Sequence, residues 1–486
     1  MKYIFKRQLS PSLVLSLLPV GLLLASIITV ICTTGASVVQ DYSHFILLGA
    51  ACVAALLSVS LTKRPKKLLA MGIAKSAGQI LPAVAILFFI GTLSATWMLS
   101  GVVPALIDYG LAILNPDFFL ITTCAVCAVV SVVTGTSWTT IATIGVAFMG
   151  IGTVMGYSPA WIAGAVISGA YFGDKVSPLS DTTVLAASTT GVELFTHIRF
   201  LLLTTIPAMA IALSVYGIAG LSTDTVSGEN ALHIRELIQS RFNITPWLLV
   251  IPALSAVMIA LRWRTDVVLA LSSLAGLAGI FIFQPDIAQM LGAGSFADST
   301  MTSLKILATS TEVATGDPTL DSLISTSGIE GMLPTVYLVL SAMIFGGVMI
   351  GSGMLSTITR AITHRLHSPR NLVGATVGSG LFLNACTADQ YLSIIIGANV
   401  YRSTYKRANM KPQLLGRTLE DSVSVTSVLI PWNSCGITQS AVLGVATLSY
   451  LPFCVFNYMS PIMSLIIAWT GWKVRIPETG KVSAVA

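Results

Sequence analysis

Charged residues are scarce in this sequence. Of its 486 residues only 9% are Asp, Glu, Lys or Arg, whereas 54% are hydrophobic and the mean hydropathy is +0.85. Soluble domains carry about 25% charged residues, so a water-soluble protein of this length would lack the polar surface that it needs. The composition therefore excludes most soluble enzymes and predicts a chain that uses its length to cross a bilayer.

Histidine and metal-binding motifs are also scarce. The sequence has five histidines, and none belongs to an H-E-x-x-H or comparable motif. Cys124 and Cys127 form a C-x-x-C pair inside the apolar run 118–133, without a second pair or a neighbouring histidine. We therefore expect no transition-metal site, no bound cofactor and no enzyme activity, and an intramembrane enzyme stays a weaker alternative.

The basic residues lie in short clusters between apolar stretches. Despite a net charge of +6, this pattern is typical of the cytoplasmic loops of membrane proteins, and nucleic-acid binding is not expected. Lys2, Lys6 and Arg7 precede the apolar stretch 11–31, which is too long for a signal peptide and predicts an uncleaved first helix. Because basic residues also lie near the other end of the chain, we expect both termini in the cytoplasm.

Apolar stretches along the chain predict membrane-spanning helices. A span needs about 20 mostly apolar residues, and the best candidates lie near 11–32, 43–61, 80–99, 118–133, 200–220, 246–261, 266–284, 334–356 and 436–470. Interrupted stretches raise the expected number to about 10 to 13 transmembrane elements. We predict an all-α polytopic membrane protein, one integral membrane domain over residues 1–486, with Asp108 and Asp117 in an outside loop.

Two of the interrupted stretches indicate an internal repeat. Polar residues break the chain at 134–140 (T-G-T-S-W-T-T) and at 384–390 (N-A-C-T-A-D-Q), and each break is followed by the pattern D-x-V-S-x-x-S. The apolar run before the first break starts outside and the run before the second starts at the cytoplasmic side. The two units are therefore predicted to be inverted relative to each other.

Inverted repeats with discontinuous helices or hairpins build the binding sites of many secondary transporters. On this basis we place the first repeat at about 80–220, the second at about 334–470, and connecting helices and loops at 221–333. The paired breaks favour alternating access over a passive channel, which is retained as an alternative.

Broken helices expose carbonyl oxygens and helix termini at membrane depth, where protein or a wet cavity must satisfy them. Carbonyls, hydroxyls and carboxylates together suit Na⁺ or a competing proton. A carboxylate at the bilayer centre costs about 2.5–3.5 kcal/mol, which favours a functional role for Asp174, Asp181, Asp389 and Asp421. Serine and threonine hydroxyls on such helices often only bond a carbonyl one turn back, and Glu420 is expected at the membrane interface.

Several motifs in these segments resemble those of a known family. The stretches 134–138, 169–183, 389–393 and 417–436 are similar to the NhaC-type sodium/proton antiporter family of the ion transporter superfamily, and G-D-K-V-S-P-L-S-D-T-T is the most specific of them. The resemblance implies a carrier of the bacterial inner membrane that exchanges Na⁺ for H⁺. It also implies a homodimer with a scaffold domain, which we expect to include helices near 11–61 and 246–284, and a moving transport domain.

The preference of Na⁺ for oxygen ligands and the family resemblance together indicate one set of candidate residues. Asp174 and Asp421 are the leading candidates for competitive binding of the transported Na⁺ and H⁺, and Asp181 and Asp389 come next. The other predicted Na⁺ ligands are hydroxyl and amide side chains: Thr136, Ser137, Ser177, Ser180, Asn384, Thr387, Ser424 and Asn433.

An organic substrate is the main alternative to a proton. The resemblance leaves open a Na⁺-coupled carrier of a malate- or lactate-type carboxylate or of an amino acid. The amides of Asn384, Gln390, Asn433 and Gln439 suit either recognition of such a solute or stabilisation of the broken helix ends. The expected partners are therefore Na⁺, H⁺ and the lipid bilayer, with a small organic anion or amino acid in the alternative.

Overall fold

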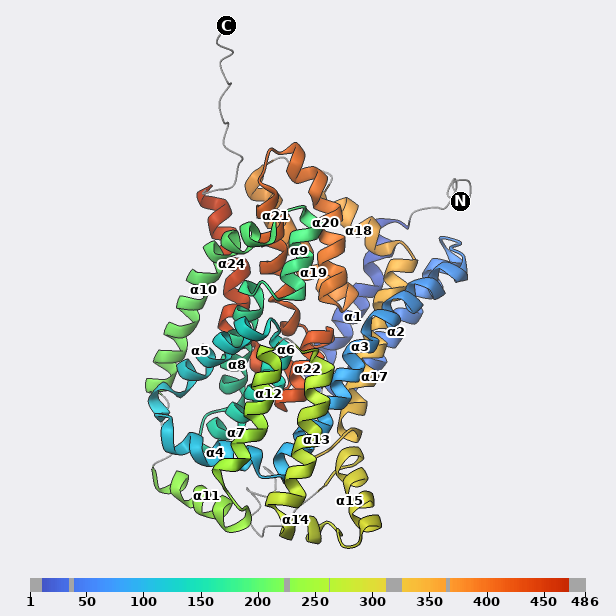
Figure 1. The fold of residues 1–486 in the computed structure, drawn as a ribbon. Helices are drawn as coiled ribbons and strands as arrows, with labels where there is room; N and C mark the ends of the chain where they lie inside the picture. The colour runs from blue at the N-terminus through green and yellow to red at the C-terminus, as the bar shows by residue number, and fades with distance from the viewer. Residues whose placement is uncertain are drawn as a thin grey trace.

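The computed structural model describes residues 11–34, 39–222, 228–261, 263–311, 326–363 and 368–471. These ranges are almost entirely helical, and their only β contact is an isolated bridge between Thr311 and Thr326 (Figure 1). The predicted all-α fold is confirmed. The basic residues close to the two termini lie outside the described ranges, so the placement of the termini stays a prediction.

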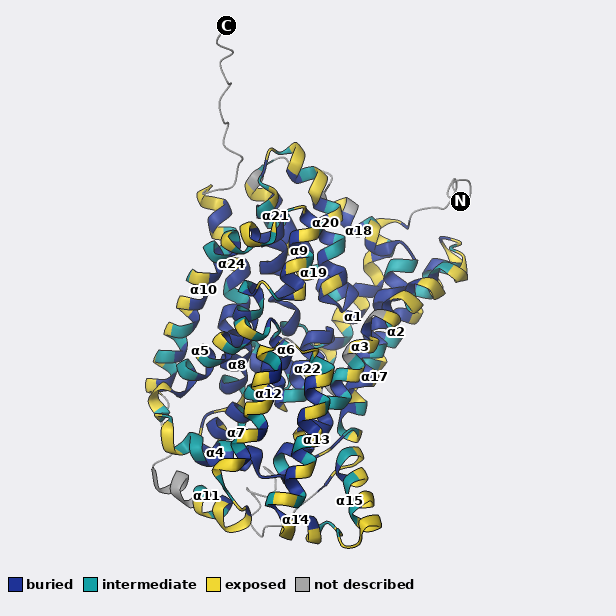
Figure 2. Ribbon diagram, in the orientation of Figure 1, coloured by how far each residue is buried: buried dark blue, intermediate teal, exposed yellow. Residues whose placement is uncertain are grey.

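Eight helices in the described ranges are long and apolar enough to cross a membrane, or up to ten when two bent pairs are counted as one span each. The eight are Leu13–Thr34, Tyr42–Ser60, Lys66–Leu99, Pro116–Thr134, Ser137–Val154, Leu194–Ser222, Thr265–Phe283 and Glu330–Gly351. Outward residues such as Ile206 and Ile218 are 56% and 68% exposed, as expected where helices contact hydrocarbon (Figure 2). The chain is a multi-pass membrane protein.

One side of the molecule is a layer of long helices. It consists of α1 (Leu13–Thr34), α2 (Val39–Ser60), α3 (Lys66–Leu99), α17 (Leu333–Gly351) and α18 (Met354–Thr363). The α17 helix packs against α2 and α3. The α3–α17 crossing is close because glycines meet there: a Cβ on Gly72 would lie 2.3 Å from the carbonyl oxygen of Gly347. The α3 helix begins at Lys66 and not near residue 80 as expected, because lysines, which favour helix, extend it on the N-terminal side of its apolar part.

A second group of helices connects the two halves of the chain. It consists of α11 (Gly228–Arg241), η4 (Pro246–Leu249), α12 (Val250–Ala260), α13 (Thr265–Phe283), α14 (Pro285–Met290) and α15 (Phe296–Ala308). The α11 helix contacts α4 (Val102–Ile113), which contains Asp108. The prediction that Asp108 lies in a loop is wrong, because this residue belongs to α4. Its carboxylate is 3% exposed and accepts hydrogen bonds from Arg235 and Gln239 at 2.9 and 2.8 Å.

Both predicted breaks form the tips of helical hairpins. The first hairpin contains α5 (Phe119–Thr134), α6 (Ser137–Thr140), the π-helical turn η3 (Ile141–Gly145) and α7 (Val146–Val154), and the second contains α19 (Pro369–Thr387) and α20 (Gln390–Arg407). In Figure 1, α7 lies in the lower part of the molecule, α20 lies in the upper part, and α6 lies near the middle. The two hairpins therefore extend from their tips toward opposite ends.

The two hairpin tips have the same backbone conformation. Gly135 (φ 72°, ψ 17°) and Ala388 (φ 56°, ψ 17°) are both left-handed, and each is followed by an extended residue, Thr136 or Asp389. The threonine before each turn accepts a hydrogen bond from the amide of that extended residue, at 3.3 Å in the first tip and 3.2 Å in the second. A different sequence thus forms the same turn twice.

Each hairpin is followed by a second helix that also breaks. These segments are α8 (Pro159–Val176), α9 (Asp181–Thr190) and α10 (Leu194–Ser222) in the first half, and α21 (Pro412–Leu419), the π-helical turn η6 (Glu420–Ser424), η7 (Ser427–Leu429), α22 (Ser434–Leu443), α23 (Thr447–Tyr450), η8 (Leu451–Phe453) and α24 (Val455–Thr470) in the second. The predicted span 436–470 is thus divided among α22, α23, η8 and α24.

The two halves match in a register that the repeated motif did not predict. Ser180 and Asn433 cap α9 and α22, and left-handed Gly191 and Gly444 end those helices. Ser180 and Asn433 are as far apart in the sequence as Gly191 and Gly444, and as Thr134 and Thr387 at the hairpin tips. In this register Asp174 corresponds to Ser427, so the two copies of D-x-V-S-x-x-S are not structurally equivalent.

Candidate ion-binding site

Asp174 connects the end of α8 to the first hairpin tip. Its Oδ2 atom accepts hydrogen bonds from the Ser137 hydroxyl at 2.7 Å and from the Ser137 backbone N–H at 3.2 Å. The side chain is half-buried. A carboxylate, a hydroxyl and the start of a short helix therefore meet where two chain breaks lie side by side.

Two serine side chains stabilise the break between α8 and α9 by hydrogen bonds. The Ser177 hydroxyl donates to the carbonyl oxygen of Val132 at 2.8 Å, which ties this break to α5, and the Ser180 hydroxyl accepts from the Thr183 N–H at 3.4 Å. Asp181 lies in the first turn of α9 and is exposed. Of the two predicted acids in this motif, only Asp174 bonds to the hairpin tip.

The second hairpin tip makes a contact equivalent to that between Asp174 and Ser137, but with the serine on the other element. The Ser427 hydroxyl donates to Gln390 Oε1 at 3.3 Å, so serine lies on the broken helix and the partner on the hairpin. Asp389 is buried and caps α20 by accepting from the Leu392 N–H at 2.8 Å. Thr387 and Asp389 thus belong to the tip itself, in the positions that Thr134 and Thr136 occupy in the first hairpin.

The predicted amide ligands mostly stabilise the breaks. Asn384 donates to the Val423 carbonyl at 2.8 Å, and Asn433 donates to the Asn384 carbonyl at 3.2 Å while capping α22. Gln439 differs, because it is fully buried and neither atom of its amide has a hydrogen-bond partner in the described part of the chain. The side-chain oxygen of Asn384 is also unpartnered there.

Asp421 lies in a buried ion pair with Lys175. The two side chains are 0% and 1% exposed, and Asp421 also accepts from Thr204 at 3.2 Å and from Ser464 at 2.6 Å. The Arg417 guanidinium is a second cation, with Nε 3.9 Å from Asp421 Oδ2. The two leading candidate acids therefore have different surroundings: Asp174 contacts a hairpin tip, and Asp421 is surrounded by cations and hydroxyls.

Glu420 is the functional candidate that the sequence interpretation missed. The sequence places Glu420 at the membrane interface; in the structure it is 0% exposed, and neither carboxylate oxygen has a partner of normal hydrogen-bond geometry among the described residues. The Ser424 hydroxyl lies close by, and Lys175, Asp174 and Asp421 interact with Glu420 electrostatically. Its position three residues after Arg417, about one helical turn, was the available signal.

This acidic cluster has one more carboxylate than cations. Its members are Asp174, Lys175, Arg417, Glu420 and Asp421. Lys175 and Arg417 both lie beside Asp421, and when all five side chains are ionised the three carboxylates and two cations leave one net negative charge. Burying a charge without a partner is costly. One proton or one monovalent cation is what the cluster needs to become neutral.

Comparison with known proteins assigns the chain to a family of transporters. Residues 169–472 match the Na⁺/H⁺ antiporter family. The chain is 35% identical to the Na⁺/H⁺ antiporter NhaC of Alkalihalophilus pseudofirmus, with 79% of this chain and 81% of the relative aligned. It is 31% identical to the malate-2H⁺/Na⁺-lactate antiporter of Bacillus subtilis (83% and 84% aligned) and 33% identical to the arginine/ornithine antiporter ArcD of Halobacterium salinarum (84% and 82% aligned). The chain belongs to the Na⁺/H⁺ antiporter family.

Proposed function

We propose that this protein is a secondary active transporter that exchanges Na⁺ for H⁺ by alternating access. The observation that carries the proposal is the contact between Asp174 and Ser137, which brings a carboxylate to a hairpin tip where two chain breaks meet. Such breaks expose backbone carbonyls and helix ends, and these groups coordinate Na⁺ in many transporters. The similarity to Na⁺/H⁺ antiporters supports the same function.

In the proposed site, Na⁺ and a proton compete for Asp174. The Ser137 hydroxyl, which now donates to the carboxylate, can rotate and present its lone pairs to Na⁺. Thr136 and Ser177 line the same pair of breaks and are the proposed additional oxygen donors. When Na⁺ leaves, a proton neutralises the carboxylate, so one cation replaces the other.

Asp421 has a different proposed role. Because Lys175, Thr204 and Ser464 already occupy its oxygens, we assign it to charge compensation rather than to Na⁺ binding. The excess carboxylate, Glu420, is proposed to share with Asp174 the one proton that the cluster carries when Na⁺ is absent. A single proton or Na⁺ then neutralises the whole cluster, which fits an exchange of the two ions.

The architecture of the proposed transporter consists of two inverted repeats. The matching turns at Gly135 and Ala388, and the matching caps at Ser180 and Asn433, support repeats at about 80–220 and 334–470 joined by 221–333. The opposite directions of the two hairpins support the inversion (Figure 1). The hairpins would move with α8 and α21 against a scaffold that includes α1, α2, α12 and α13.

The proposed location is the bacterial inner membrane, with both termini in the cytoplasm and a homodimer as the functional unit. Basic residues at the end of α20 and in the α2–α3 connection lie in the same upper part of Figure 1, which supports one cytoplasmic side. The family consists of antiporters, so we propose transport without enzymatic chemistry and without a bound cofactor. Na⁺, H⁺ and the bilayer are the partners.

Proton flux in proteoliposomes tests the proposal. Purified protein is reconstituted with a pH-sensitive dye inside the vesicles, and a Na⁺ gradient is imposed in either direction. We expect the internal pH to change only when protein and Na⁺ are both present, and to reverse its direction with the gradient. Potassium replaces Na⁺ in the control.

A Na⁺-coupled organic solute carrier is the second candidate. Two relatives are named as antiporters of malate and lactate or of arginine and ornithine. The unpartnered amide of buried Gln439 is the observation in this chain that favours a solute with its own hydrogen-bonding groups. Uptake of malate, lactate or an amino acid driven by Na⁺ without Na⁺-dependent pH change would replace the antiporter proposal with this candidate.

A further inference from the structure

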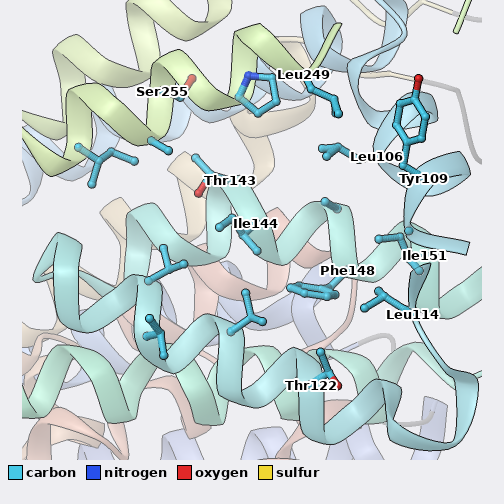
Figure 3. Close-up of a pocket in the computed structure, with 18 of the residues that line it drawn as sticks. Leu106, Tyr109, Leu114, Thr122, Thr143, Ile144, Phe148, Ile151, Leu249 and Ser255 are labelled. Carbon is cyan, nitrogen blue, oxygen red and sulfur yellow. The ribbon is translucent and has the colours of Figure 1, made fainter. Parts of the chain in front are cut away.

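A deep apolar groove separates α12 from the first hairpin. Its volume is about 550 Å³, within the range of roughly 300–1,000 Å³ of pockets that bind small molecules. The walls are side chains of α4, α5, α7 and α12, among them Leu106, Phe148 and Ile151 (Figure 3). The groove extends to Thr134 and Thr143 beside the hairpin tip. It lies outside the acidic cluster described above.

The groove offers few polar groups to a ligand. The Thr143 hydroxyl, which points from η3 in Figure 3, donates to the Thr139 carbonyl at 2.7 Å. The Ser255 hydroxyl bonds the Ile251 carbonyl at 3.0 Å and Ser272 at 2.6 Å, and the Trp97 indole donates to the Ser272 carbonyl at 3.3 Å. These three groups are used within the protein, and the other polar groups of the lining, the Tyr109, Thr122 and Thr134 hydroxyls, are uncharged, so the groove is unsuited to a charged solute or ion.

The rim of the groove is continuous with the lipid-facing surface. Val129 and Val133 on α5 are 65% and 52% exposed, and Ile113 at the end of α4 is 80% exposed. Behind them, Phe148 and Ile151 are 7% and 5% exposed. Val129 and Val133 belong to the candidate span Pro116–Thr134, so hydrocarbon chains are expected to contact this rim, and an apolar cavity of this kind does not hold water.

We infer that an acyl chain of a bilayer lipid occupies this groove between α12 and the α5–α7 hairpin. The ligand is hydrocarbon, recognised by shape and apolar contact, and its head group stays outside the groove. The lipid would fill space between the proposed scaffold and the first hairpin, so that these elements meet through hydrocarbon rather than through interlocked side chains. The inference concerns binding and does not depend on which solute is transported.

Photo-crosslinking tests this site. The full-length protein is reconstituted into phosphatidylethanolamine and phosphatidylglycerol vesicles in which a fraction of the lipid carries a diazirine on its acyl chain, and adducts are mapped by mass spectrometry. We expect adducts on Phe148 and Ile151 as well as on the rim residues Val129 and Val133. Adducts on the rim alone would overturn the inference.

Two substitutions on one helix provide a matched comparison. Ala256 and Ala253 are both exposed on α12, but only Ala256 lines the groove. Ala256→Trp should reduce adducts on Phe148 and Ile151 several-fold, whereas Ala253→Trp should leave them at the wild-type level. If the fold of A256W is impaired, Ala147→Met fills the groove from the opposite wall and should give the same loss. Equal labelling of Phe148 in all correctly folded variants would contradict occupancy of the groove.

Discussion

At the scale of single residues, the buried pair of Lys175 and Asp421 makes a clear stability prediction. Removing one partner of a buried ion pair leaves an uncompensated charge and typically costs about 3–5 kcal/mol. We expect Lys175→Ala to lower thermal stability in detergent strongly. The double variant with Asp421→Ala should be less destabilised than the sum of the two single changes. Additive losses would mean that the two side chains do not interact.

Glu420 gives a second residue-scale prediction. Glutamine has almost the same shape as a protonated glutamate, so Glu420→Gln should fold and retain thermal stability. It should lower Na⁺-dependent proton flux more than about tenfold, equivalent to about 1.4 kcal/mol, because the proposed proton carrier is absent. Glu330→Gln is the control, since Glu330 is exposed in η5 (Glu330–Met332), the 3-10 turn before α17. Normal flux in E420Q would assign Glu420 a structural role.

The candidate acids could be predicted from the sequence only in part. Asp174 and Asp421 were recognisable because a carboxylate in an apolar stretch is costly. The burial of Glu420 was not predictable, because basic residues nearby in the sequence favoured an interfacial position. The pairing of Lys175 with Asp421 joins residues far apart in the chain, and no periodicity in one sequence indicates such a contact.

At the scale of elements, the two hairpin turns differ in the space available for a Cβ atom at the left-handed residue. Gly135 and Ala388 have the same left-handed conformation, but an added Cβ on Gly135 would lie 2.5 Å from Leu179 Cβ. Gly135→Ala should therefore lose stability by more than the roughly 1–2 kcal/mol of left-handed strain, and lower Na⁺-dependent flux. Ala388→Gly removes a strained Cβ and should retain stability. Thermal unfolding of both variants measures the difference, and equal stability would contradict the close contact.

The breaks themselves were predictable, but their register was not. Gly, Ser and Thr in apolar runs indicated that helices end near 134–140 and 384–390. The four identical residues of D-x-V-S-x-x-S then suggested a false correspondence, because structurally equivalent positions carry different residues, such as Thr136 and Asp389. Backbone conformation is repeated here, whereas side-chain chemistry is repeated only in part, as at Thr134 and Thr387.

At the scale of the whole molecule, alternating access requires the hairpins to move against the scaffold. The Thr139 and Thr265 hydroxyls lie 3.3 Å apart across that boundary, between α6 and α13. In a background lacking Cys32 and Cys52, an oxidised Thr139→Cys, Thr265→Cys pair should block Na⁺-dependent flux, and reduction should restore it. Unchanged flux after complete crosslinking would exclude movement at this boundary.

A second cysteine pair controls for crosslinking itself. The Ser255 and Ser272 hydroxyls lie 2.6 Å apart, and both belong to the proposed scaffold, on α12 and α13. Their replacement by cysteine should allow a disulfide within one unit and leave the flux unchanged. The division into scaffold and transport domain was inferred from resemblance, because hydropathy alone assigns every apolar helix to the bilayer and none to a moving part.

The most direct test of the central claim is the pH dependence of Na⁺ binding to the purified protein, measured with radiolabelled Na⁺. If Na⁺ and H⁺ compete at Asp174, the apparent affinity for Na⁺ should fall as the pH is lowered, and Asp174→Asn should abolish binding. Asp286→Asn is the matched control and should bind like the wild type, since Asp286 is exposed in the first turn of α14 and is not a candidate ligand. Na⁺ binding that is independent of pH, or that survives in D174N, would contradict the account.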